Sequence, residues 1–156
     1  MKLLIAGGAL LIAVQGTAFG QAAPKIAVAL EARSEGRDGR DATGARVYDE
    51  VRRGLETIGD VQLVASKEAR RIIWIVAGAT AGPYAASVMI TERYDRETLM
   101  VLGIEDDDMA ARMMALQIVN DHQIFTASDP GDLARRIVAA VNGGIFARLR
   151  AVQPKR

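Results

Sequence analysis

Cysteine is absent from this chain of 156 residues, and histidine occurs once, at His122. Without cysteine the protein can form no disulfide, no thiolate metal centre and no cysteine nucleophile. It also lacks the residue that carries a lipid at a processed amino terminus. One histidine is fewer than the two or more His or Cys ligands of a usual transition-metal site. The folded domain must therefore be held together by its hydrophobic core.

An excess of charge of one sign is missing as well. The 20 Lys and Arg residues face 19 Asp and Glu residues, which gives a formal net charge of +1. A dedicated nucleic-acid-binding protein needs a basic surface that this balance does not supply, so no nucleic-acid partner is expected. Hydrophobic residues make up 50% and charged residues 25% of the chain, as in ordinary globular domains.

The longest apolar run lies at the amino terminus. Lys2 precedes an uncharged stretch, Leu3–Val14, and small residues suited to cleavage follow within 18–22. The run is shorter than the about 20 apolar residues that cross a bilayer, and the pattern is typical of a secretory signal peptide. We therefore predict a signal peptide at 1–22, no stable membrane anchor after its cleavage, and a periplasmic or secreted protein.

The remaining chain predicts one α/β domain at 25–150, followed by a basic tail at 151–156. Strand-like segments lie at 26–33, 61–65, 72–77, 85–94 and 99–104. The near-continuous apolar run at 72–77 predicts a central strand buried on both faces. The first two strands flank a helix and should form a parallel crossover unit. The last two are joined by a short polar connection and should form a hairpin. The expected fold is a single mixed sheet of about five strands with helices packed on it.

Apolar spacing and capping residues predict three helices. The apolar stripe of the first contains Val47, Val51, Leu55 and Ile58, and that of the last contains Leu133, Ile137, Val141 and Ile145. The acidic residues 106–108 begin the second, which is expected to reach about Asn120. Ser128 or Asp129 should cap the last helix, which Gly143–Gly144 should weaken or end.

The charged loop after the first strand is the candidate binding site. Arg33, Arg37 and Arg40 follow a strand and precede a helix, a position where α/β sheets bind ligands and the helix dipole favours anions. Three guanidinium groups could hold a carboxylate or a phosphate of a ligand or partner. The alternative is a solvated loop in which these arginines pair with acidic neighbours.

The same loop has the glycine spacing of a phosphate loop, at Gly39 and Gly44. However, Ala45 and Arg46 occupy the positions where that motif requires Lys and a hydroxyl residue. A nucleotide site is therefore not expected.

Two other groups of residues leave an alternative function open, a small hydrolase or a metal-binding protein. The carboxylates of Glu105–Asp108 could bind a hard cation, although a helix start explains the run equally well. His122 lies beside Asp121, but no Gly-x-Ser-x-Gly nucleophile motif accompanies the pair. The preferred prediction has no catalytic residue, no metal and no cofactor.

The order of elements, the export signal and the strands within 26–33, 61–65 and 88–102 resemble small α/β domains of bacterial envelope assemblies. Examples are the amino-terminal domain of TolB and the CsgG-like secretion modules. The similarity covers 25–142 in pattern, matches no motif specific to these families and so carries no functional residue over. CsgG-like lipoproteins begin at a lipidated Cys, which this chain lacks. The resemblance implies a non-catalytic binding or assembly module of the cell envelope with a protein partner; it leaves the oligomeric state open.

Overall fold

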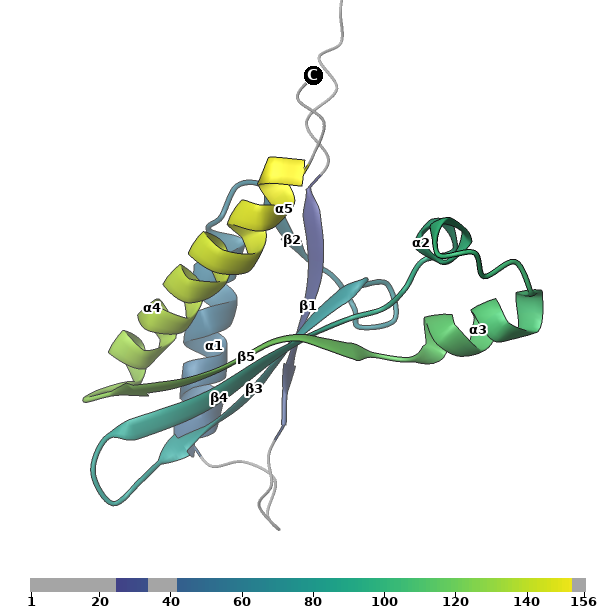
Figure 1. The fold of residues 1–156 in the computed structure, drawn as a ribbon. Coiled ribbons are helices and arrows are strands. Elements are labelled where there is room, and N and C mark those ends of the chain that lie inside the picture. The colour runs from purple at the N-terminus through teal and green to yellow at the C-terminus, as the bar shows by residue number, and fades with distance from the viewer. Residues whose placement is uncertain (1–24, 34–41, 153–156) are drawn as a thin grey trace, which may run out of the picture.

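The computed structural model describes residues 25–33 and 42–152, which form a single five-stranded mixed sheet with helices packed on it, as predicted (Figure 1). In chain order the elements are β1 (Ile26–Ala32), α1 (Ala42–Glu56), β2 (Val61–Leu63), β3 (Arg71–Ala79), β4 (Tyr84–Glu92), α2 (Arg96–Val101), α3 (Asp107–Ala115), β5 (Ile118–Ala127), α4 (Pro130–Val141), the π-helical turn η1 (Asn142–Phe146) and α5 (Ala147–Val152). The predicted signal peptide lies outside the described residues.

The strands follow one another across the sheet in the order β2-β1-β3-β4-β5. β1 runs parallel to both β2 and β3, which confirms the parallel crossover unit. β3 and β4 are antiparallel, as are β4 and β5, so the sheet is mixed. One edge is formed by the three residues of β2 and the other by the ten residues of β5.

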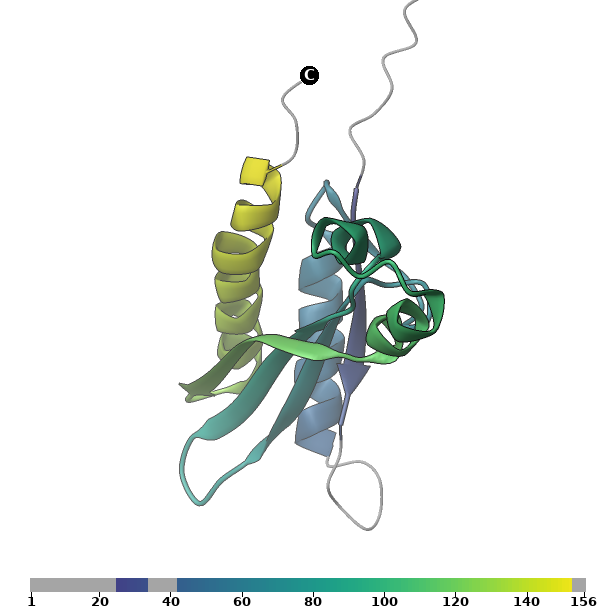
Figure 2. The same cartoon turned by 45° about the vertical axis from the view of Figure 1, so that its right-hand side comes forward.

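Helices α1 and α4 lie side by side on one face of the sheet (Figures 1 and 2). The predicted stripe positions within these helices are buried, because apolar residues three or four apart share one helix face. Ile58, predicted as the last position of the first stripe, lies beyond the end of α1 and is half-buried. Val47, Val51 and Leu55 of α1 and Leu133 and Ile137 of α4 are all 0% exposed. They pack against the inward-pointing strand residues Val28, Ile73, Ile75, Val88 and Ile90.

The beginning of α4 is capped as the sequence predicts. The Asp129 carboxylate accepts a hydrogen bond from the backbone N–H of Asp132 at 2.9 Å, and Pro130 occupies the first turn. Both features satisfy or remove a backbone donor that a helix start would otherwise leave unpaired.

A smaller apolar cluster lies on the other face of the sheet. It contains Ala29, Ala69 and Ile72, with Trp74 packed against it. The indole Nε1 of Trp74 donates to Oγ1 of Thr91 at 2.9 Å, which gives this buried hydroxyl a partner. Buried apolar residues on both sides of β3 confirm that it is a central strand.

The predicted hairpin between 85–94 and 99–104 is wrong. The second of these segments begins with the last three residues of α2, a helix whose first turn is capped by Asp95 accepting from the backbone N–H of Thr98 at 2.7 Å. Gly103 follows with φ of +78°, a conformation that glycine adopts without strain, and it turns the chain toward α3. The local capping interactions therefore override the strand-like composition.

The helix predicted from 106 to about 120 is too long. α3 ends at Ala115, and β5 begins at Ile118 and pairs with β4. The strand was not predicted, because its first apolar residues directly follow those of the preceding helix, and the sequence shows no break between the two elements. Its pairing partner, β4, lies far away along the chain.

The glycine pair Gly143–Gly144 does not end the last helix. The backbone widens there into η1 and continues as α5 to Val152, two residues into the predicted tail. Arg150 of α5 forms a bidentate pair with Asp60, with Nε–Oδ2 and Nη2–Oδ1 distances of 2.6 and 2.8 Å. No helix in the described part of the chain is long and apolar enough to span a membrane.

Candidate binding surface

Residues 96–116 leave the sheet between β4 and β5 and are called the arm below. They contain α2 and α3, which project beyond the strands on the side away from α4 (Figures 1 and 2). Each helix buries one apolar residue, since Leu99 and Ala110 are 0% and 1% exposed. The arm is therefore a packed unit that stands out from the main core.

Polar contacts connect the two helices of the arm. Asp106 caps α3 by accepting from the backbone N–H of Met109 at 2.6 Å. Nη2 of Arg96, at the start of α2, donates to the carbonyl of Glu105 at 3.0 Å and to Oδ1 of Asp107 at 2.7 Å. The acidic run proposed as a cation site therefore begins a helix, and within the described residues no group of three or more His, Cys, Asp or Glu could hold a metal ion.

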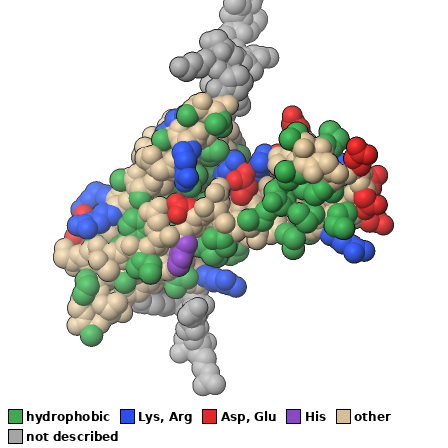
Figure 3. Space-filling view, viewed as in Figure 1, with side chains coloured by type: hydrophobic (Ala, Val, Ile, Leu, Met, Phe, Trp, Pro, Cys, Tyr) green, Lys and Arg blue, Asp and Glu red, His purple; other side chains and the backbone are tan. Residues whose placement is uncertain are grey.

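The outer surface of the arm is apolar and acidic. Its exposed apolar side chains are Met100, Val101, Leu102, Met109 and Leu116, with exposures of 56%, 83%, 58%, 51% and 54%. The arm contains five acidic and two basic residues. Figure 3 shows apolar side chains over the arm and acidic ones gathered at its outer end. Such a contiguous apolar surface is typical of a protein-binding site.

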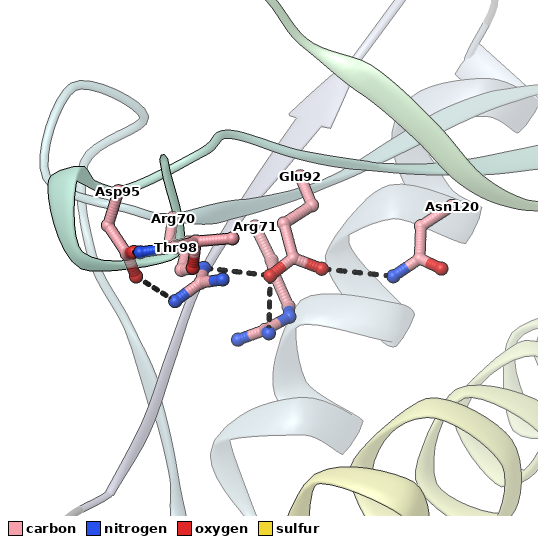
Figure 4. Close-up of polar contacts among 6 residues, drawn as sticks. All are labelled: Arg70, Arg71, Glu92, Asp95, Thr98 and Asn120. Atoms are coloured by element: carbon pink, nitrogen blue, oxygen red, sulfur yellow. Dashed lines mark hydrogen bonds and ion pairs between the residues drawn. The ribbon is translucent and has the colours of Figure 1, made fainter. Parts of the chain in front are cut away.

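A cluster of four charged residues and one amide, the root cluster, lies where the arm leaves the sheet (Figure 4). It consists of Arg70, Arg71, Glu92, Asp95 and Asn120. Oε1 of Glu92 lies 2.7 Å from Nε of Arg70 and 2.6 Å from Nη2 of Arg71, and its Oε2 accepts from Nδ2 of Asn120 at 3.1 Å. Glu92 therefore connects the start of β3 to the start of β5.

The root cluster also holds the first turn of α2. Asp95 pairs with Arg70 while it caps the helix through Thr98. Hydrogen bonds from the side chain and then the backbone of Thr98, aided by Arg70, lower the pKa of Asp95 from its ordinary 3.8. Burial lowers the pKa of Arg71, and Glu92 opposes this shift. The arm is thus attached to the sheet through ionised groups.

A cavity of about 310 Å³ opens beside the root cluster. Its walls are formed by Arg70, Glu92, Arg93, Tyr94, Thr98, Ile118, Val119 and Asn120. Nε of Arg93 is buried without a hydrogen-bond partner in the described part of the chain. A cavity of this size with guanidinium groups and apolar walls can accept one side chain or a chain end that carries a carboxylate.

The predicted arginine site is described only at Arg33. This residue follows β1, and its guanidinium carbon lies 5.9 Å from the centre of the Trp74 ring, a cation–π distance. Arg37 and Arg40 lie outside the described residues, so the predicted site stays a prediction. Gly44, the second glycine of the phosphate-loop spacing, lies inside α1, where an added Cβ would be 2.6 Å from the carbonyl oxygen of Ala77. Close packing explains this glycine.

His122 lies on strand β5. Its Nε2 is 2.8 Å from Oγ of Ser87 on β4, a pairing that the sequence analysis did not identify. Asp121 points to the opposite face, as neighbouring residues of a strand do, and its carboxylate accepts from Nε2 of Gln123 at 2.8 Å. Asp121 therefore cannot orient the imidazole of His122 as the acid of a catalytic triad would.

Sequence reasoning missed the root cluster. One signal was available in the β3–β4 hairpin. Arg71 begins β3 and Glu92 ends β4, so their opposite charges lie directly across from each other in the ladder. The contribution of Asn120 could not be found in this way, because the beginning of β5, up to about Asn120, was predicted as the end of a helix.

No known protein family model matches this chain, and no curated protein is detectably similar to it.

Proposed function

We propose that this protein is an exported, non-catalytic binding module of the cell envelope, and that its protein partner docks on the arm. The observation that carries the proposal is the apolar surface of the arm, where Val101 is 83% exposed although the helix that carries it buries Leu99 fully. A chain that buries its core this well elsewhere has no folding reason to keep such a surface in water. A binding role supplies that reason.

The charge of the arm specifies the chemistry of the partner. With five acidic and two basic residues, the arm repels an anionic membrane surface and attracts a protein surface whose apolar centre is rimmed by Lys or Arg. The cavity at the root cluster can receive one acidic side chain of that same partner, since the arginines Arg70 and Arg93 are among the residues that line it.

The proposed location in the envelope rests on the sequence. The pattern of Lys2, Leu3–Val14 and the small residues within 18–22 supports export, and the resemblance to small envelope domains supports an assembly role. Cleavage near 20–23 is tested by amino-terminal sequencing of protein from the native host. An intact Met1 on cytosolic protein would refute export.

The partner is tested by affinity capture from the native cell envelope. Wild-type protein is compared with Val101→Lys on the arm and with Val152→Lys on α5, a matched control because Val152 is 78% exposed. We expect Val101→Lys to lose a basic partner that the wild type and Val152→Lys retain, with no change in melting temperature. Equal recovery of all partners by the three proteins would refute docking on the arm.

A hydrolase that uses Ser87 and His122 is the second candidate function, favoured by their contact of 2.8 Å. Among residues 25–33 and 42–152 no carboxylate is hydrogen-bonded to His122, and the pair lies on an exposed surface. Covalent labelling by a serine-directed fluorophosphonate, abolished by Ser87→Ala and by His122→Ala, would establish it. The binding module predicts no labelling above that of Ser87→Ala.

A further inference from the structure

Strand β5 is a long edge of the sheet, and near its end Nη1 of Arg136 on α4 donates to the carbonyl of Thr126 at 3.5 Å. The strand is ten residues long, whereas the opposite edge, β2, has only three. Folded proteins usually protect a long edge strand with Lys, Pro or a covering segment, because its free N–H and C=O groups can pair with another chain. The sequence of β5 contains no Lys or Pro, and its one charged residue is Asp121. Its bulge lies only near its beginning, opposite Ile90 and Thr91.

Apolar side chains line the same strand. Ile124 is 74% exposed and Val119 is 56% exposed, although both belong to a strand that is paired along one side. A second strand beside β5 would cover these side chains and pair the free backbone groups at the same time.

We propose that β5 pairs antiparallel with β5 of a second copy of this chain and forms a two-fold symmetric dimer with a continuous ten-stranded sheet. A two-fold contact uses the same edge on both copies and is closed. Both ends of the joined sheet are then β2, whose three residues offer too little edge for further addition. The short β2 edge thus allows a dimer and disfavours an open polymer.

The charges at the two ends of β5 complement each other under this symmetry. The acidic arm adjoins the beginning of β5, and α4 begins just after its end, so the two lie at opposite ends of the strand (Figure 1). On α4, Arg135 and Arg136 are 72% and 59% exposed and share the carboxylate of Asp132. A two-fold axis near the middle of β5 places the arm of each copy beside these arginines of the other. This favours a second copy over an unrelated extended peptide.

The dimer is tested by sedimentation velocity on the full chain as processed by its host, over a wide range of protein concentrations. Ile124→Lys places two like charges close to the axis and should raise the dimer dissociation constant at least about tenfold. Val152→Lys is the control of matched exposure and should leave it unchanged. Unchanged melting temperatures would show that the variants fold. A wild type that stays monomeric, or a dimer indifferent to Ile124→Lys, would overturn the proposal.

The absence of cysteine from the chain permits a second, independent test. Four single variants are made: His122→Cys, Ile124→Cys and Thr126→Cys on β5, and Val101→Cys on the arm. Each can form only an intermolecular disulfide. The proposal requires oxidation to cross-link a β5 position much faster than position 101. Fastest cross-linking at 101 would assign the contact to the arm and refute pairing through β5.

The dimer and the proposed partner can fail separately. Val101→Lys should abolish capture of the envelope partner and leave the β5 cross-link intact. Ile124→Lys should weaken the dimer even if no partner is ever captured. If the β5 cross-link disappears in Val101→Lys as well as in Ile124→Lys, the claim that the arm and β5 are separate binding surfaces is wrong.

Discussion

Replacing Glu92 by Gln should loosen the attachment of the arm to the sheet. Glu92 accepts from Arg70, Arg71 and Asn120, with distances between 2.6 and 3.1 Å, and its side chain is 21% exposed. Gln keeps the shape but removes the charge, and it places an NH₂ donor either at the Oε1 position, where two donors converge, or at the Oε2 position, where Asn120 donates. Arg71, whose side chain is 17% exposed, then loses its paired carboxylate.

The expected cost follows from the burial of these groups. Removing one partner of a fully buried ion pair costs about 3–5 kcal/mol, while an exposed pair contributes about 0–1 kcal/mol. Glu92 and Arg71 lie between these limits, and Arg70 is more exposed and retains Asp95. We therefore expect the free energy of unfolding to fall by about 2 kcal/mol. With a urea m-value of about 1–3 kcal/mol/M, the urea midpoint should fall by about 1 M.

The measurement is urea unfolding followed by circular dichroism, combined with amide hydrogen exchange. Glu68→Gln is the control, because Glu68 is exposed on the neighbouring turn and has no ion pair among the described residues. Exchange in residues 96–116 should accelerate in Glu92→Gln more than exchange in α1. If Glu92→Gln loses no more stability than Glu68→Gln, the root cluster does not hold the arm, and the reasoning is refuted.

Two further predictions concern packing and pH. Gly44→Ala should destabilise the protein by about 1–2 kcal/mol despite the better helix propensity of Ala, because the new Cβ would lie 2.6 Å from the Ala77 carbonyl oxygen. Gly59 has open space around it, so the control Gly59→Ala should be neutral or slightly stabilising in the same urea assay. Equal effects of the two substitutions would contradict the packing argument. Hydrogen bonds from Arg150 to Asp60 and from Thr98 to Asp95 lower both pKa values from 3.8, so their stabilisation is present above about pH 4 and is lost as the pH falls through the lowered values. The urea midpoint should fall less steeply in acid for Asp60→Asn than for wild type, and parallel curves would exclude this contribution.

The sequence by itself determined the features that depend on neighbouring residues. The buried stripes of α1 and α4, the Asp129 cap and the central β3 strand were predicted because helix periodicity, capping and apolar runs are local properties. The mixed character of the sheet was predicted from a hairpin between 85–94 and 99–104 that does not form; the antiparallel pairs in the structure are β3–β4 and β4–β5.

Tertiary structure decided the segment between β4 and α4. Residues 99–104 and 118–127 are both apolar enough for either helix or strand, and only pairing with β4 selects the second as β5. The root cluster could not be predicted for the same reason, since Glu92 and Asn120 meet only after that pairing forms. The exposure of Val101 and Ile124 was equally hidden. An apolar residue looks the same in the sequence whether it fills the core or lies on a binding surface, and only the folded chain distinguishes the two.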